Sequence, residues 1–135
     1  MPNESHLEFY RRWHRLSKPY IRWQFDQFQP SVGRRVADVG CGLGNFTELL
    51  ADRDFYLGLD LDEELLQELA NEHRQRPQVK TARLDITKPE LEQTLGANRV
   101  DTVLFLNFIE HVVRPLQRLL PSPFGMSAIG ILSKN

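Results

Sequence analysis

Apolar and polar positions follow two different periods along this chain. Ser5 and Glu8 have the spacing of a capping box and precede apolar side chains at helical spacing, which predicts an amphipathic helix over 5–17. Pro19 ends that helix, and a second short helix is predicted over 21–28. The later pattern predicts, in order, strand 35–39, helix 46–52, strand 55–60, helix 62–74, strand 79–84, helix 89–95, strand 100–106 and helix 108–120. Strands that alternate with helices predict an α/β fold, a parallel sheet with helices on both faces.

The first strand runs directly into three glycines, Gly40, Gly42 and Gly44. Glycine at alternate positions is easiest to explain where the chain turns tightly and a ligand lies against its backbone, so this loop is predicted to hold a nucleotide cofactor. A dinucleotide fingerprint has the spacing Gly-x-Gly-x-x-Gly, but Asn45 occupies the place of its third glycine. An NAD-dependent oxidoreductase is therefore the less favoured alternative.

Two polar features support the cofactor loop. Asn45 and Glu48 have capping-box spacing, which predicts a helix start whose free N–H groups and positive dipole end favour a bound carboxylate. Asp60 ends the second strand, 20 residues after Gly40. At that distance an acid at the edge of a parallel sheet reaches a ribose diol.

Four motifs in this order resemble those of class I S-adenosylmethionine-dependent methyltransferases. They are Asp38 before the glycine loop, Asp60 after the second strand, Asp85 after the third, and Asn107 with Glu110-His111 after the fourth. The last segment resembles the branch of the family that acts mostly on small molecules and lipids. The resemblance, which covers residues 36–112, implies a Rossmann-like sheet in the order 3-2-1-4 and S-adenosylmethionine as the cofactor. It also implies methyl transfer to a small-molecule acceptor.

The resemblance further implies which residues bind the cofactor. They lie on the glycine loop and at the strand ends: Asp38, Gly40, Cys41, Gly42, Gly44, Asn45, Phe46, Asp60, Leu61, Asp85, Ile86 and Asn107. Asp60 is expected at the ribose and Asp85 near the adenine, although an acid before Ile86 and Thr87 is an equally good turn former. The sulfonium already activates the methyl group, so alignment suffices and the chemistry demands no catalytic residue. His111 is more simply explained as a helix-face histidine than as a general base.

Composition narrows the class of protein. With 135 residues, 41% hydrophobic and 26% charged, the chain has the size and composition of one soluble domain, and its longest apolar run is too short to span a membrane. One cysteine excludes an internal disulfide and fits a cytoplasmic protein. His and Cys show no pair at zinc spacing, so no metal is expected. A net charge of −1 gives no overall attraction to nucleic acid.

Charge also divides the chain. Residues 1–34 are expected to form a helical cap, 35–112 the cofactor-binding core, and 113–135 an atypical segment with a candidate fifth strand over 128–132. All acids after the cap lie before residue 111, which suggests a chain that is truncated or frameshifted near 112. The alternative function is therefore a non-catalytic or incomplete module that needs a partner, and an exposed sheet edge would favour a homodimer.

The first predicted helix carries a stripe of apolar side chains mixed with arginines. Phe9, Trp13, Leu16 and Tyr20 recur at helical spacing, which favours core contact or a lid over the cofactor. A nucleic-acid patch of basic and aromatic residues is the less favoured alternative.

Overall fold

The computed structural model describes residues 4–105 and 131–133. Its elements are α1 (His6–Leu16), α2 (Lys18–Phe28), the 3₁₀ turn η1 (Gln29–Ser31), β1 (Arg35–Val39), β2 (Phe55–Asp60), α3 (Glu63–Glu72), β3 (Val79–Arg83), α4 (Glu90–Ala97), β4 (Thr102–Leu104) and β5 (Ile131–Ser133). The predicted helix over 108–120, which contains His111, and the predicted site residue Asn107 lie outside the described residues.

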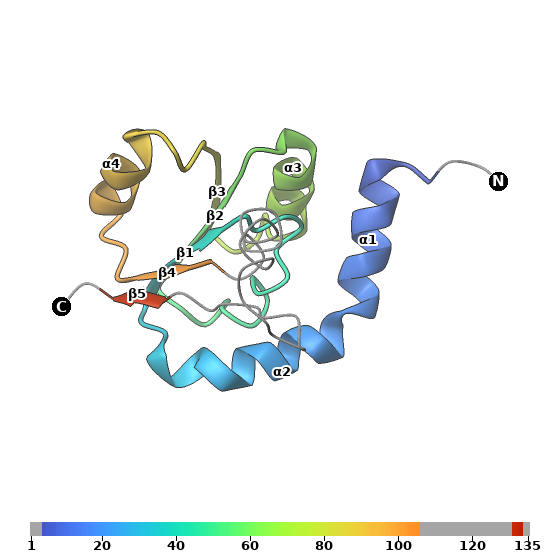
Figure 1. Ribbon diagram of the computed structural model, residues 1–135, viewed down its shortest axis with the longest axis horizontal. Helices are drawn as coiled ribbons and strands as arrows, with labels where there is room; N and C mark the ends of the chain where they lie inside the picture. Colours follow the sequence, from blue (N-terminus) through green and yellow to red (C-terminus); the bar gives the residue numbers. More distant parts are fainter. Residues whose placement is uncertain (1–3, 106–130, 134–135) are drawn as a thin grey trace, which may run out of the picture.

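The strands form one sheet in the order β3-β2-β1-β4-β5 (Figure 1). β3, β2, β1 and β4 pair in parallel, so the predicted Rossmann-like order 3-2-1-4 is confirmed. β5 pairs with β4 in the antiparallel direction, with Thr102 opposite Ser133. The described strand β5 overlaps the end of the predicted 128–132 and does not extend the parallel part of the sheet.

The central strands are buried on both faces. Val36, Ala37 and Val39 of β1 have almost no exposed surface, as expected for a parallel strand between two layers of helices. One apolar cluster packs against α2 and contains Ile21, Phe25, Phe28, Val36, Phe46, Leu50, Tyr56 and Leu104. The opposite cluster packs against α4 and contains Ala37, Val39, Phe55, Leu57, Leu59 and Val103.

The two N-terminal helices are attached in different ways. The predicted capping box is present in α1, because Ser5 Oγ accepts from the Glu8 N–H at 3.2 Å and Glu8 Oε2 accepts from the Ser5 N–H at 3.0 Å. α2 begins before Pro19, since a proline in the first helical turn loses no hydrogen bond. α2 buries Ile21, but α1 buries none of its residues. Core contact is therefore the wrong explanation for the apolar stripe of α1.

The predicted helix over 46–52 is wrong, because this segment is a series of turns. The N–H of Thr47 donates to the Gly44 carbonyl at 3.1 Å, and the Leu50 N–H is shared between the carbonyls of Phe46 and Thr47. The side chains of Phe46, Thr47 and Leu50 are fully buried, so packing beneath α2 holds the segment where a helical ladder was expected. The other described boundaries differ from the predicted ones by at most three residues.

Candidate cofactor site

The parallel strands place the predicted site residues at one edge of the sheet. β1 leads into the glycine loop (residues 40–44), β2 ends at Asp60, and Asp85 follows β3. Gly40, Gly42 and Gly44 have φ angles of 68°, 55° and 80°, in the left-handed region that favours glycine. The tight turn predicted from the sequence is therefore present.

Most N–H groups of the glycine loop are used within the protein. Those of Gly40 and Cys41 donate to the Leu59 carbonyl at 2.8 and 3.1 Å, and that of Gly44 donates to the Cys41 carbonyl at 2.8 Å. The Gly42 N–H donates to the Asp60 carboxylate. The expectation that a helix start aims free N–H groups at the ligand is thus wrong, and the loop instead offers a surface without side chains.

Asp60 is held in place from two sides. Its Oδ2 accepts from the Gly42 N–H at 2.8 Å, and its Oδ1 accepts from the Asp62 N–H at 3.0 Å. A carboxylate oxygen has two lone-pair sites, so each oxygen can still accept one further hydrogen bond. Leu61 follows with 59% of its surface exposed, which leaves an apolar face beside the fixed acid. A ribose diol and an adjoining base would meet the matching groups here.

α1 covers this edge through a face that the sequence analysis missed. A Cβ atom on Gly42 would lie 3.9 Å from the ring of Tyr10. His6 Nε2 lies 2.7 Å from Asp62 Oδ2, and His14 Nδ1 lies 2.8 Å from Asn45 Oδ1. The four-residue spacing of His6, Tyr10 and His14 could have indicated this face.

Asp38 lies beneath the loop as a buried acid. Tyr56 donates a hydrogen bond from its hydroxyl to Asp38 Oδ2 at 2.8 Å. Burial raises the pKa of Asp38 to about 7, with a further contribution from the nearby Asp60, although the Tyr56 hydrogen bond opposes the shift. The carboxyl group therefore changes charge near neutral pH.

This raised pKa predicts a pH-dependent stability. The stability contributed by protonated Asp38 is fully present below the unfolded-state pKa and is lost as pH rises through the folded-state value of about 7. Between about pH 6 and about pH 8.5 the loss is expected to be about 1.4 kcal/mol. An Asp38→Asn variant keeps an acceptor for Tyr56 without the titration. Urea unfolding at both pH values should show the drop in the wild type alone, and equal drops in the two proteins would contradict the assignment.

Two loop residues are explained by packing. Cys41 is buried, and burial raises the pKa of its thiol, so it remains uncharged. Phe46 belongs to the core and contacts Phe28 edge to face at 5.5 Å. The Phe46 side chain is therefore unavailable to a ligand, and backbone contact with the cofactor stays a prediction for both residues.

Asp85, which follows β3, has the contacts of a turn former, the alternative to a contact with the adenine. Asp85 Oδ1 accepts from the N–H of Thr87 at 2.9 Å and from its hydroxyl at 2.7 Å, as in an Asx turn. Ile86 is partly buried against the α4-side cluster. Contact of either residue with the cofactor stays a prediction.

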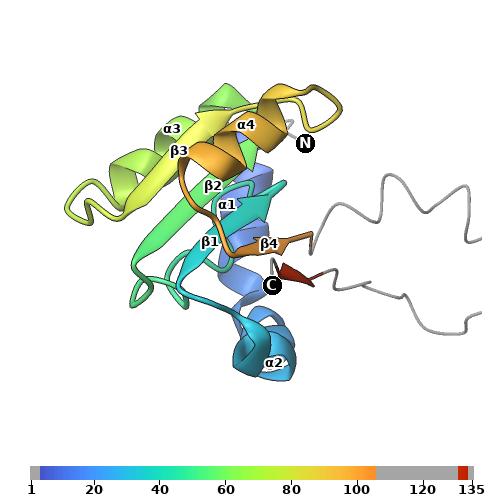
Figure 2. The same cartoon turned by 90° about the vertical axis from the view of Figure 1, so that its left-hand side faces the viewer.

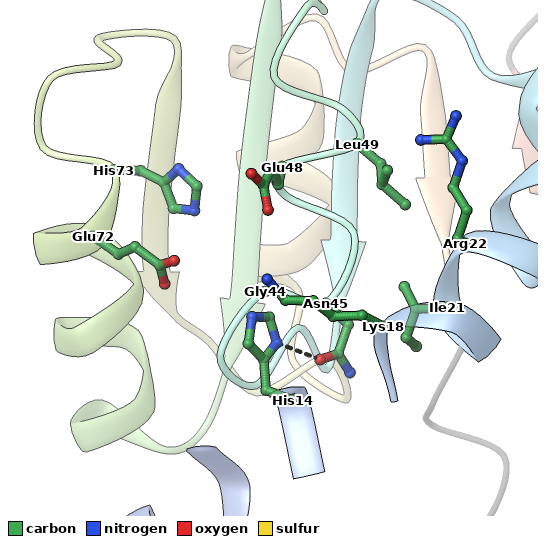
Figure 3. A pocket seen from close by; sticks show the side chains of 10 residues that line it. All are labelled: His14, Lys18, Ile21, Arg22, Gly44, Asn45, Glu48, Leu49, Glu72 and His73. Atoms are coloured by element: carbon green, nitrogen blue, oxygen red, sulfur yellow. Dashed lines mark hydrogen bonds between the residues drawn. The ribbon is translucent and has the colours of Figure 1, made fainter. Parts of the chain in front are cut away.

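A separate cavity of about 180 Å³ lies between the α1–α2 junction, the segment after the glycine loop and the end of α3 (Figure 3). His14, Glu48 and His73 are among its lining residues, whereas Asp60 is not. Burial lowers the pKa of His73, which favours its neutral form. Among residues 4–105 and 131–133, no three His, Cys, Asp or Glu side chains are grouped so that they could hold a metal ion.

Comparison with known proteins agrees with this arrangement. A family model described as a methyltransferase domain matches residues 37–122, which is more than half of the chain. The chain therefore belongs to the methyltransferase domain family, and the resemblance to class I S-adenosylmethionine-dependent methyltransferases is confirmed.

Two curated relatives are ubiquinone biosynthesis O-methyltransferases. The protein from Methylococcus capsulatus is 37% identical over 97 residues, which cover 70% of this chain and 40% of that protein. The one from Alkalilimnicola ehrlichii is 34% identical over 109 residues, which cover 76% of this chain and 43% of that protein. The chain thus spans less than half of the length of these relatives.

A solved structure shows the same fold. The S-adenosylmethionine-dependent methyltransferase from Anabaena variabilis superposes with a TM-score of 0.56 at 20% sequence identity, over 67% of this chain and 39% of that one. No helix in the part of the chain that the structure describes is long and apolar enough to cross a membrane.

Proposed function

We propose that this chain binds S-adenosylmethionine at the edge formed by the glycine loop and Asp60, and that it takes part in methyl transfer to a small-molecule acceptor. The observation that carries the proposal is the Asp60 carboxylate, fixed by the N–H groups of Gly42 and Asp62 with a lone pair of each oxygen left for a hydroxyl. It lies at the carboxyl end of β2, where a ribose binds in folds of this type.

Each part of this edge has a task in binding. Gly42, which has no side chain, lets a ligand approach the loop backbone closely, and the ring of Tyr10 lies beside the position that a Cβ atom of Gly42 would take. Asp60 binds the ribose hydroxyls, and ionised Asp38 contributes a negative potential that favours a cationic ligand. The cofactor supplies an already activated methyl group, so the protein must mainly align the reactants and exclude water.

The names of the curated relatives suggest the acceptor class. Both relatives are named as O-methyltransferases, so we propose a hydroxyl oxygen of a small molecule as the methyl acceptor. In the reaction the bond between sulfur and the methyl carbon breaks, an oxygen–carbon bond forms, and the hydroxyl proton leaves to solvent or a base.

A cofactor-binding module completed by a partner chain is the second candidate. The observation that favours it is the coverage, since the chain matches only 40% and 43% of the two relatives. For the compartment we propose the cytoplasm, because the one cysteine is free and buried. Pairing of two copies through a sheet edge is the assembly that we propose.

A methyl-transfer assay separates the two candidates. The chain is mixed with S-adenosylmethionine labelled in the methyl group and with a panel of small phenols and alcohols. Label in the acceptor, strongly reduced with an Asp60→Ala variant, is expected for the enzyme. Cofactor binding without transfer to any acceptor would contradict the enzymatic proposal and favour the incomplete module.

A further inference from the structure

Five large apolar side chains of α1 and α2 face outward, and they form what we call the apolar stripe. Their exposed fractions are 48% for Phe9, 53% for Trp13, 63% for Leu16, 47% for Tyr20 and 59% for Trp23. Among the described residues, one further large apolar side chain, Leu61, is similarly exposed. Such a concentration on two short helices marks an interaction surface.

Helix geometry places the stripe on one side of the molecule. In α1, Phe9 directly precedes Tyr10, whose ring contacts the glycine loop. In α2, Tyr20 directly precedes the buried Ile21. Successive residues of an α-helix are rotated by about 100°, so in both helices the outward residue is turned from the inward one by the same angle and in the same direction. Figure 1 shows α1 and α2 bordering the molecule along two adjoining sides. Tyr20 also stacks on Trp23, with ring centroids 6.0 Å apart. The outward residues of both helices therefore face a common side.

Cations flank the apolar stripe. The stretch 9–25 contains five Lys and Arg residues and no acid. Three of these cations pair with acids, Arg11 with Glu68, Arg12 with Glu4 and Arg22 with Asp26. Arg15 and Lys18 form no ion pair within the described residues. The charge around the stripe would favour an anionic partner.

We propose that the apolar stripe and its flanking cations bind the surface of an anionic membrane. Amphipathic helices with Trp, Phe and Leu on one side and Arg or Lys beside them lie in the lipid interface, where the cations reach the headgroups. A second copy of the same face would bring like charges together. Leu16, the most exposed residue of the stripe, has no ring to stack on a nucleic-acid base but inserts readily among acyl chains.

This binding is peripheral and does not depend on the proposed methyl transfer. It would place the cofactor domain against a lipid surface, from which a lipophilic acceptor could be drawn. Cofactor binding in solution and lipid binding can be measured separately, so failure of one proposal leaves the other intact.

Vesicle titration tests the proposal directly, because Trp13 and Trp23 are the two tryptophans of the chain and both lie in the stripe. Addition of vesicles that contain phosphatidylglycerol should shift tryptophan emission to shorter wavelength and carry the protein with the vesicles on flotation. Vesicles of phosphatidylcholine alone should bind at least about tenfold more weakly, and high salt should release the protein.

Matched variants identify the surface. Phe9→Ser with Leu16→Ser keeps both tryptophans and should weaken vesicle binding about tenfold or more. Arg15→Gln with Lys18→Gln should weaken it about tenfold to thirtyfold at low salt. The control, Arg74→Gln with Lys80→Gln, removes two exposed cations outside α1 and α2 and should bind as the wild type does. Circular dichroism establishes that each variant is folded.

Three results would overturn the proposal. The first is equal affinity for the two kinds of vesicle, or binding to neither. The second is wild-type binding by the folded Phe9→Ser, Leu16→Ser variant. The third is loss of a dimer, or of binding to an oligonucleotide, in the stripe variants while vesicle binding is absent. That last result would assign the stripe to a second copy or to nucleic acid instead.

Discussion

Replacing Asp60 by alanine is expected to weaken binding of S-adenosylhomocysteine by about tenfold to a hundredfold. The variant removes the carboxylate that would accept the ribose hydroxyl hydrogen bonds, and the expected range corresponds to the loss of one charge-assisted bond worth about 1.5–3 kcal/mol. It also frees the N–H groups of Gly42 and Asp62, so the glycine loop loses one of its hydrogen bonds to β2. Equilibrium dialysis with the labelled ligand measures the change in Kd.

Asp54→Ala is the matched control for this effect. Asp54 is an exposed acid just before β2, and it pairs with Arg34 at 2.7 Å. It lies at the opposite end of β2 from Asp60. The Asp54→Ala variant loses one negative charge, as the Asp60→Ala variant does, and its Kd for S-adenosylhomocysteine should be unchanged. An unchanged Kd in a folded Asp60→Ala protein would show that the ribose binds elsewhere.

Gly44→Ala is expected to lower the free energy of unfolding strongly. Gly44 has φ +80°, a conformation that costs an L-residue about 1–2 kcal/mol. An added Cβ would also collide with Thr47 Oγ1 and lie 2.5 Å from Leu69 Cδ1, and such overpacking costs about 1–3 kcal/mol more. Urea unfolding should show a midpoint shifted well below that of the wild type.

Gly96→Ala, which is also a glycine-to-alanine substitution, is expected to raise the stability of the protein. Gly96 lies inside α4, and a Cβ there would have nothing within 4 Å. The added methyl group should stabilise the helix by about 0.5–1 kcal/mol. Equal effects at the two positions would contradict the packing described around Gly44.

Most of the fold could be predicted from the sequence because its strands and most of its helices have clear patterns of apolar residues. β1 and β2 are mostly apolar runs, interrupted by Arg35, Asp38 and Asp60. Such runs predict strands that are buried on both faces, and Figure 2 shows the two strands between α2 and α4. The failure over 46–52 has a local cause. Phe46 and Leu50 have helical spacing, but their burial beneath α2 is satisfied by successive turns that start at the left-handed Gly44.

The candidate site was predictable only in part. The strand ends of Asp38 and Asp60 follow from the order of the motifs, since parallel strands bring their carboxyl ends to one edge. The use of the Gly42 N–H by Asp60 depends on a contact between residues 18 apart and has no local signal. The position of Tyr10 has no local signal either, because its contact with Gly42 joins residues that are far apart in the sequence.

The most direct test of the central claim is calorimetric titration of the chain with S-adenosylhomocysteine and, separately, with NAD. Both ligands offer a ribose to Asp60, but the Gly-x-Gly-x-Gly loop, with Asn45 bonded to His14, lacks the third glycine of a dinucleotide site. The account predicts saturable one-site binding of S-adenosylhomocysteine, with NAD at least about a hundredfold weaker, a difference of about 2.7 kcal/mol. Binding of NAD as tight as that of S-adenosylhomocysteine, or tighter, would contradict it.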